Sequence, residues 1–150
     1  MSIKHKSPLS TIYIGGGTPS ILNPLQIKDL INLFKENYRI DYGAEITMEV
    51  DPSSFNEDEL YGYIKAGINR FSLGVQSFNN QVLEQAGRRH DSKDVEKSCF
   101  WLKKAYDHGF IRCWSLDLIQ NLPKCSFKKW QEELKLSLRF CPPHLSLIHI

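Results

Sequence analysis

The feature that most constrains the fold of this chain is the repeated alternation of strand-like segments with segments of helical periodicity. Short β-branched and apolar segments are separated by longer segments in which apolar residues recur every three or four positions. Strands that are joined through helices pair in parallel with right-handed crossovers, so this order predicts an α/β fold with a parallel sheet. The expected strands are Thr11–Ile14, Ala44–Val50, Arg70–Gln76, Ile111–Ile119 and His144–Ile150.

Helical segments occupy the intervals between these strands. The first expected helix follows Pro24. The second has Asn56 as its expected N-cap and Gly67 as its stop signal. The remaining helices are expected at Asn79–Ala86, Ser92–His108 and Ser126–Arg139. About five strands with their helices match part of a (β/α) barrel or an open doubly wound sheet.

Three of the expected strands alternate polar and apolar residues. Strands that are buried on both faces are normally apolar throughout. Here the apolar faces can pack beneath the helices, and the polar faces then line a lumen or a broad cleft. An antiparallel sheet with one wet face is the alternative, and the helices between the strands argue against it. The polar faces consist of Glu45, Thr47 and Glu49, then Arg70, Ser72, Gly74 and Gln76, then Cys113, Ser115 and Asp117.

A glycine-rich loop, Gly15–Gly17, ends the first strand. Ligands of parallel α/β folds bind at the carboxyl ends of the strands, and glycines let backbone groups approach a ligand closely. Such a loop can also be a plain tight turn. No P-loop lysine follows it and no GxGxxG motif is present, which argues against a nucleoside triphosphate or a Rossmann-type dinucleotide.

Polar side chains near the ends of later strands are expected at the same edge of the sheet as the glycine-rich loop. Glu49, Gln76 and Asp117 share a face and suit ribose hydroxyls or an ammonium group, or else form a buried structural cluster. Arg88 follows the helix stop Gly87 and can meet a carboxylate, or can be a surface arginine. A lone histidine, His90, is more often structural than a ligand or a base.

Five motifs then occur in an order that resembles one family. They are Ile14-Gly-Gly-Gly-Thr-Pro-Ser20, Glu49-Val-Asp-Pro52, Leu73-Gly-Val-Gln-Ser-Phe-Asn79, Gly87-Arg-Arg-His90 and Leu116-Asp-Leu-Ile119 with Leu122-Pro123. The set is similar to the radical S-adenosylmethionine (SAM) family of oxygen-independent coproporphyrinogen III oxidase, including its haem-chaperone branch, HemW. The resemblance runs from about Thr11 to Ser146.

The resemblance implies a partial TIM-like barrel that binds SAM. It assigns Gly16, Gly17 and Thr18 to the methionine part of SAM, and it completes the site with Glu49, Gln76, Arg88 and Asp117. Arg88 is expected to pair with the SAM carboxylate. No catalytic residue and no metal ligand are assigned to this stretch, and His90 is not expected to bind haem iron.

The motifs around Gln76 and His90 are closer to the haem-chaperone branch than to the oxidase, which removes carboxyl groups from propionates. The expected partners are therefore SAM, haem or a porphyrinogen, and a haem-acceptor protein. Two other hypotheses stay open: a non-catalytic haem-binding module, and an unrelated barrel enzyme that binds a phosphorylated sugar.

The family holds a [4Fe–4S] cluster with a CxxxCxxC motif upstream of the glycine-rich loop, and this motif is absent here. The four cysteines, Cys99, Cys113, Cys125 and Cys141, are too widely spaced to replace it. Residues 1–150 are therefore expected to be a radical SAM core truncated at both ends, inactive alone, with the cluster confined to the full-length parent.

Charge and hydropathy exclude some classes of partner. The net charge is only +2, which gives no basis for nucleic-acid binding. No apolar run approaches the roughly 20 residues of a membrane helix. The first residues lack the apolar core of a secretory signal. We therefore expect a cytoplasmic protein, or a mitochondrial one if a missing N-terminus carries a transit peptide.

Overall fold

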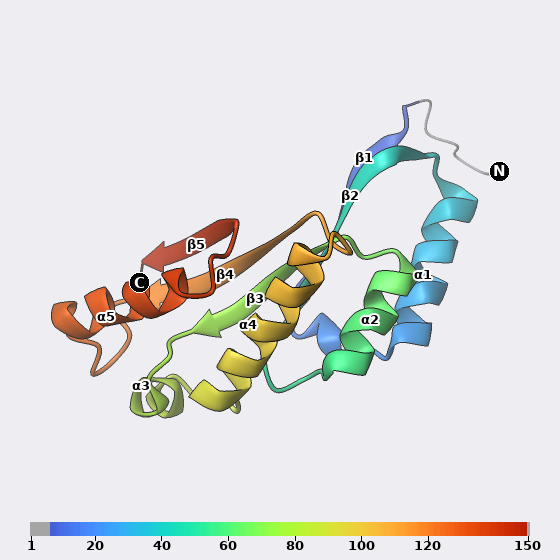
Figure 1. Ribbon diagram of the computed structural model, residues 1–150. Coiled ribbons are helices and arrows are strands. Elements are labelled where there is room, and N and C mark those ends of the chain that lie inside the picture. Colours follow the sequence, from blue (N-terminus) through green and yellow to red (C-terminus); the bar gives the residue numbers. More distant parts are fainter. Residues whose placement is uncertain (1–6, 150) are drawn as a thin grey trace.

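Five parallel strands form a single sheet in the computed structural model, which describes residues 7–149 (Figure 1). The strands pair in the order β1-β2-β3-β4-β5, so every crossover advances the sheet in one direction. A doubly wound sheet would reverse its order near the middle. The sequential order confirms the partial (β/α) barrel. The strands are β1 Leu9–Ile14, β2 Ile40–Val50, β3 Arg70–Gln76, β4 Cys113–Gln120 and β5 His144–His149.

Helices connect successive strands, and the α-helices among the described residues begin at side-chain caps. Asn56 accepts from the backbone N–H of Glu59, and Glu59 accepts in return from the N–H of Asn56. Gly67 ends the same helix with a φ of 116°, as its sequence position predicts. The helical elements are η1 Pro19–Ile21, α1 Pro24–Asn37, α2 Glu57–Ala66, α3 Asn80–Gln85, α4 Ser92–Asp107 and α5 Phe127–Leu138.

The hydrophobic core lies between the helices and one face of the sheet. The helices contribute Ile27, Ile31, Leu60, Leu102 and others to it. Burial of these apolar faces is the main force that holds the sheet and helices together. Because the helices cover this face, the other face of the sheet is left to line the lumen. The apolar strand residues of the core are Ile12 of β1, then Ile46, Met48 and Val50, then Phe71, Leu73 and Val75, and finally Trp114, Leu116 and Leu118.

The polar faces of the strands come together on the lumen side, as the alternation predicted. Glu49 of β2 pairs in register with Ser72 of β3, which pairs with Ser115 of β4. Asp117 lies two residues after Ser115 on the same face of β4, opposite Ser146 of β5. The parallel register therefore collects the polar residues of several strands into one lining.

Several details differ from expectation, among them the start of β1 at Leu9 rather than Thr11 and the end of β4 at Gln120 rather than Ile119. β2 begins at Ile40, earlier than predicted, because it extends along β1 to a pairing with Leu9. The register of β3 shifts between Leu73 and Gln76, where Gln76 adopts a φ of 67°. β4 begins at Cys113 rather than at Ile111. The expected end of the last strand, Ile150, lies outside the described residues. Within residues 7–149, no helix is both long enough and apolar enough to span a bilayer.

Candidate cofactor-binding site

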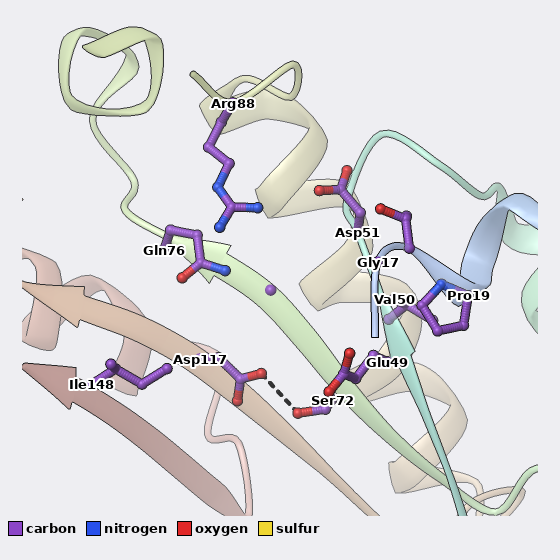
Figure 2. A pocket seen from close by; sticks show the side chains of 12 residues that line it. Gly17, Pro19, Glu49, Val50, Asp51, Ser72, Gln76, Arg88, Asp117 and Ile148 are labelled. Atoms are coloured by element: carbon purple, nitrogen blue, oxygen red, sulfur yellow. Dashed lines mark hydrogen bonds between the residues drawn. The ribbon is translucent and has the colours of Figure 1, made fainter. Parts of the chain in front are cut away.

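A cleft of about 260 Å³ opens at the carboxyl ends of β2, β3 and β4 (Figure 2). Six of the seven residues predicted for the site line it, namely Gly17, Thr18, Glu49, Gln76, Arg88 and Asp117. The seventh, Gly16, donates its backbone N–H to Glu49 Oε2 over 3.0 Å. The fold therefore brings all seven to one edge of the sheet. That they bind SAM stays a prediction.

The carboxylate of Glu49 is held by two donors from the first strand and its loop. Tyr13 donates its hydroxyl to Glu49 Oε1 over 2.8 Å, and the Gly16 N–H holds the other oxygen. Partial burial, together with this carboxylate, raises the pKa of Tyr13 and keeps its hydroxyl protonated as a donor. Sequence patterns did not predict the role of Tyr13, because the contact joins residues 36 positions apart.

Asp117 is more strongly desolvated than a surface carboxylate. Burial raises its pKa, the nearby charge of Glu49 adds to that rise, and hydrogen bonds from Ser72 and Ser115 partly oppose it. Ser72 donates to Asp117 Oδ2 over 2.7 Å (Figure 2). Ser115 donates to Oδ1 over 3.3 Å. The two serines fix the carboxylate at the wall of the cleft.

Gln76 is the residue of the cleft whose polar group most clearly lacks a partner. Its side chain lines the cleft, yet its amide oxygen is buried and accepts no hydrogen bond within the described part of the chain. A buried acceptor without a donor costs about 1–3 kcal/mol. The strained backbone at this residue, with a φ of 67°, also resembles the strain that is stored at functional sites. A ligand with a donor group would satisfy this oxygen.

Arg88 is the only basic residue among the described residues that line the cleft. It follows Gly87, whose φ of 68° turns the chain after α3, and its side chain points down toward Gln76 (Figure 2). The side chain is exposed and forms no ion pair within residues 7–149. It is therefore free to meet an anionic group of a ligand.

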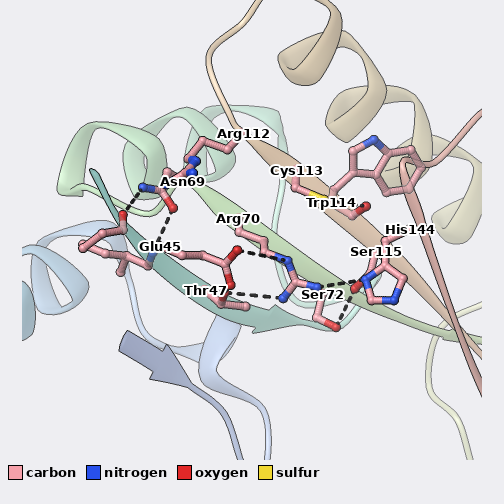
Figure 3. A network of polar contacts seen from close by, with 12 residues as sticks. Glu45, Thr47, Asn69, Arg70, Ser72, Arg112, Cys113, Trp114, Ser115 and His144 are labelled. Carbon is pink, nitrogen blue, oxygen red and sulfur yellow. Dashed lines mark hydrogen bonds and ion pairs between the residues drawn. The ribbon is translucent and has the colours of Figure 1, made fainter. Parts of the chain in front are cut away.

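A second arginine, Arg70, lies deeper in the lumen and is already occupied. Its guanidinium lies 3.8 Å from Glu45 Oε2 and 3.1 Å from His144 Nδ1, and it approaches Thr47 Oγ1 at 3.5 Å (Figure 3). This network lies at the start of β3, whereas the cleft lies at the carboxyl ends of the strands. The guanidinium of Arg70 is thus already engaged by side chains of β2 and β5.

The described cysteines do not match an iron–sulfur cluster. Cys99 is fully buried in α4, where burial raises its thiol pKa to about 12. Cys113, Cys125 and Cys141 lie at the start of β4, after β4 and after α5. Across residues 7–149, no three His, Cys, Asp or Glu side chains converge as a metal site. A [4Fe–4S] cluster therefore has no ligand set in the described residues.

Comparison with known proteins agrees with the fold and with the motifs. Residues 1–123 match the radical SAM superfamily. The heme chaperone HemW of Synechocystis sp. is 39% identical over 139 residues, which cover 93% of this chain and 33% of that protein. The oxygen-independent coproporphyrinogen III oxidase of Salmonella typhimurium is 36% identical over 153 residues, covering 98% of this chain and 33% of that protein.

The structural comparison points in the same direction. Coproporphyrinogen III oxidase (HemN) from Escherichia coli, described as a radical SAM enzyme, superposes with a TM-score of 0.83 at 36% identity. The match covers 93% of this chain and 31% of that one. The chain thus spans about a third of the length of these relatives.

Proposed function

The chain belongs to the radical SAM superfamily, and from this premise we propose that the cleft at the carboxyl ends of β2, β3 and β4 binds SAM. When bound, SAM supplies a sulfonium centre whose carbon–sulfur bond can be cleaved. The residues proposed to hold it are Gly16, Gly17, Thr18, Glu49, Gln76, Arg88 and Asp117.

The observation that carries this proposal is the unpartnered amide oxygen of Gln76 in a cleft with charges of both signs. SAM combines a carboxylate, an ammonium group and ribose hydroxyls in one molecule. Arg88 would meet the carboxylate, and Glu49 and Asp117 would accept from the ammonium group or the hydroxyls. The glycine-rich loop would let backbone groups reach the ligand. The alternative of a structural carboxylate cluster leaves Gln76 and Arg88 without partners.

Equilibrium dialysis with labelled SAM tests the proposal. We expect saturable binding to the protein, and a roughly tenfold or larger loss in Glu49→Gln and Arg88→Ala, since hydrogen bonds to charged groups contribute about 1.5–3 kcal/mol. The matched control is Glu36→Gln, which alters an exposed carboxylate on α1. Loss of affinity in the control as well, or no saturable binding, would reject the site.

For the longer protein we propose the role of a haem chaperone of the HemW kind. The support is the resemblance of the motifs around Gln76 and His90, together with the HemW relatives. An oxygen-independent coproporphyrinogen III oxidase is the second candidate, supported by the Salmonella relative and the HemN structure. Haem, a haem-acceptor protein and a [4Fe–4S] cluster belong to this proposal for the longer protein.

Two assays on the longer protein separate the candidates. A chaperone binds haem in an absorbance titration, transfers it to an apo-acceptor, and leaves coproporphyrinogen III unchanged. An oxidase converts coproporphyrinogen III with release of carbon dioxide. Haem binding that persists in a variant unable to bind SAM would instead support a non-catalytic haem-binding module.

A further inference from the structure

His90 lies in the loop between α3 and α4, and its side chain is fully buried. Its Nε2 lies 3.1 Å from the backbone carbonyl oxygen of Val75, and its Nδ1 lies 3.3 Å from Asp51 Oδ2. The Nδ1 contact has the distance of an ion pair without the direction of a hydrogen bond. Because the ring has no exposed edge, it cannot reach a ligand in the cleft.

The two neighbours of the ring can only accept hydrogen bonds. A neutral imidazole donates from one nitrogen, whereas an imidazolium donates from both. Asp51 is ionised at neutral pH: although burial raises its pKa, the interactions with His90 and with the N–H and hydroxyl of Ser53 lower it to about 2. In either state the nitrogen that faces Val75 can donate to its carbonyl, while the half-buried Asp51 carboxylate lies beside the other nitrogen.

These contacts join three segments that each carry a residue of the proposed site. Asp51 follows β2 two positions after Glu49, and Val75 immediately precedes Gln76 in β3. His90 comes two positions after Arg88, in the loop between α3 and α4. Arg88 itself is tied to α3 by its backbone N–H, which donates to the Leu83 carbonyl over 2.9 Å. The ring thus anchors the far side of the short loop that presents Arg88.

We propose that His90 is a positioning residue that links Asp51 to the Val75 carbonyl and thereby holds Arg88 over the cleft, where Arg88 can meet the carboxylate of the bound ligand. The inference rests on the proposed SAM site. It adds a residue that contacts no ligand and acts through Arg88.

The test compares SAM with decarboxylated SAM, which lacks only the carboxylate. Wild-type protein should prefer SAM by roughly tenfold, as expected for one charge-assisted contact. Arg88→Ala should abolish the preference, and His90→Ala should reduce it to about the same extent. The Arg88→Ala/His90→Ala double variant should lose no further preference, because both changes remove one contact. A general loss of structure would weaken both ligands equally and leave the preference intact.

His90→Gln and His108→Ala complete the design. Glutamine can still donate to the Val75 carbonyl, so His90→Gln should retain part of the preference for SAM. His108 is an exposed histidine whose Nδ1 lies 2.7 Å from the Lys104 carbonyl oxygen and whose ring stacks on Phe110, away from the residues of the cleft, so His108→Ala should match wild type. Circular dichroism checks folding, and His90→Gln replaces the alanine variant if the latter does not fold.

The outcomes separate the inference from its premise. If wild-type protein prefers SAM and both His90 variants keep the full preference, the positioning role is wrong and the SAM site stands. If wild-type protein binds SAM without any preference over the decarboxylated analogue, the role of Arg88 is wrong and that of His90 falls with it. If it does not bind SAM, the proposed function fails first.

Discussion

Gly15→Ala tests whether the carboxylate of Glu49 takes part in ligand binding. Gly15 does not adopt a positive φ, so alanine is compatible with its backbone. A Cβ at this position, however, would lie 2.6 Å from Tyr13 Cε1 and 2.8 Å from Glu49 Oε1. Real Cβ atoms essentially never come this close, so the hydrogen-bonded pair of Tyr13 and Glu49 must move.

The expected effects on stability and on affinity differ. Both displaced groups are side chains, and replacing glycine at a compatible position stabilises by about 0.4–1 kcal/mol through the unfolded chain. We therefore expect the unfolding free energy to change by less than about 1 kcal/mol. Displacing Glu49 from a charge-assisted contact worth about 1.5–3 kcal/mol should weaken SAM binding roughly ten- to hundredfold.

Urea denaturation and equilibrium dialysis measure the two quantities on the same samples. The matched control is Gly43→Ala in β2, where a Cβ would meet nothing within 4 Å and φ is not positive. It should leave both stability and affinity near the wild-type values. SAM binding by Gly15→Ala within threefold of wild type, with stability unchanged, would refute the reasoning that Glu49 holds the ligand.

Three further outcomes follow from the described contacts. Gly17 has a φ of 61° and open space around it, so Gly17→Ala should lower the free energy of unfolding by about 1 kcal/mol, the usual cost of a left-handed non-glycine residue. Urea denaturation measures this change. Tyr63→Phe should lower the free energy of unfolding by about 1–2 kcal/mol, because the hydroxyl donates to the carbonyls of Ser20 and Leu22. SAM is cationic, so its affinity should fall as Asp117 gains a proton on acidification. Because the pKa of Asp117 is raised above 3.8, the fall should begin at a higher pH than for an ordinary aspartate, and Asp117→Asn should flatten this part of a dialysis pH profile.

Local signals predicted most of the fold because local physics decides it. The alternation of polar and apolar residues located β3 without error, since burial of one face requires that period. The caps at Asn56 and Gly67 set the limits of α2 through hydrogen bonds and a positive φ that few other residues supply. Where no periodic signal existed, at the exposed start of β2, the prediction was short.

Contacts between distant segments could not be predicted in the same way. Alternation predicted the face of Gln76 but not the register shift before it, because a glutamine gives no sign of a positive φ. Nor did the pattern reveal Glu133 of α5, a buried carboxylate that accepts from the Ser77 hydroxyl and the Phe78 N–H beside the cleft. Its pKa is raised by burial, and its partners lie more than 50 residues away in the chain.

The charges around the cleft distinguish between the ligands that the sequence left open. Three carboxylates line it, and that of Asp51 lies beside the ring of His90 and accepts from the N–H and hydroxyl of Ser53. Glu49 and Asp117 then remain as two negative groups beside one positive group, Arg88. SAM carries two positive centres and one negative centre, which is the complementary set. A sugar phosphate would bring two negative charges toward these carboxylates, and each like-charge pair at about 5 Å costs roughly 3 kcal/mol at an effective dielectric constant of about 20. The balance of charge therefore favours SAM over a phosphorylated sugar.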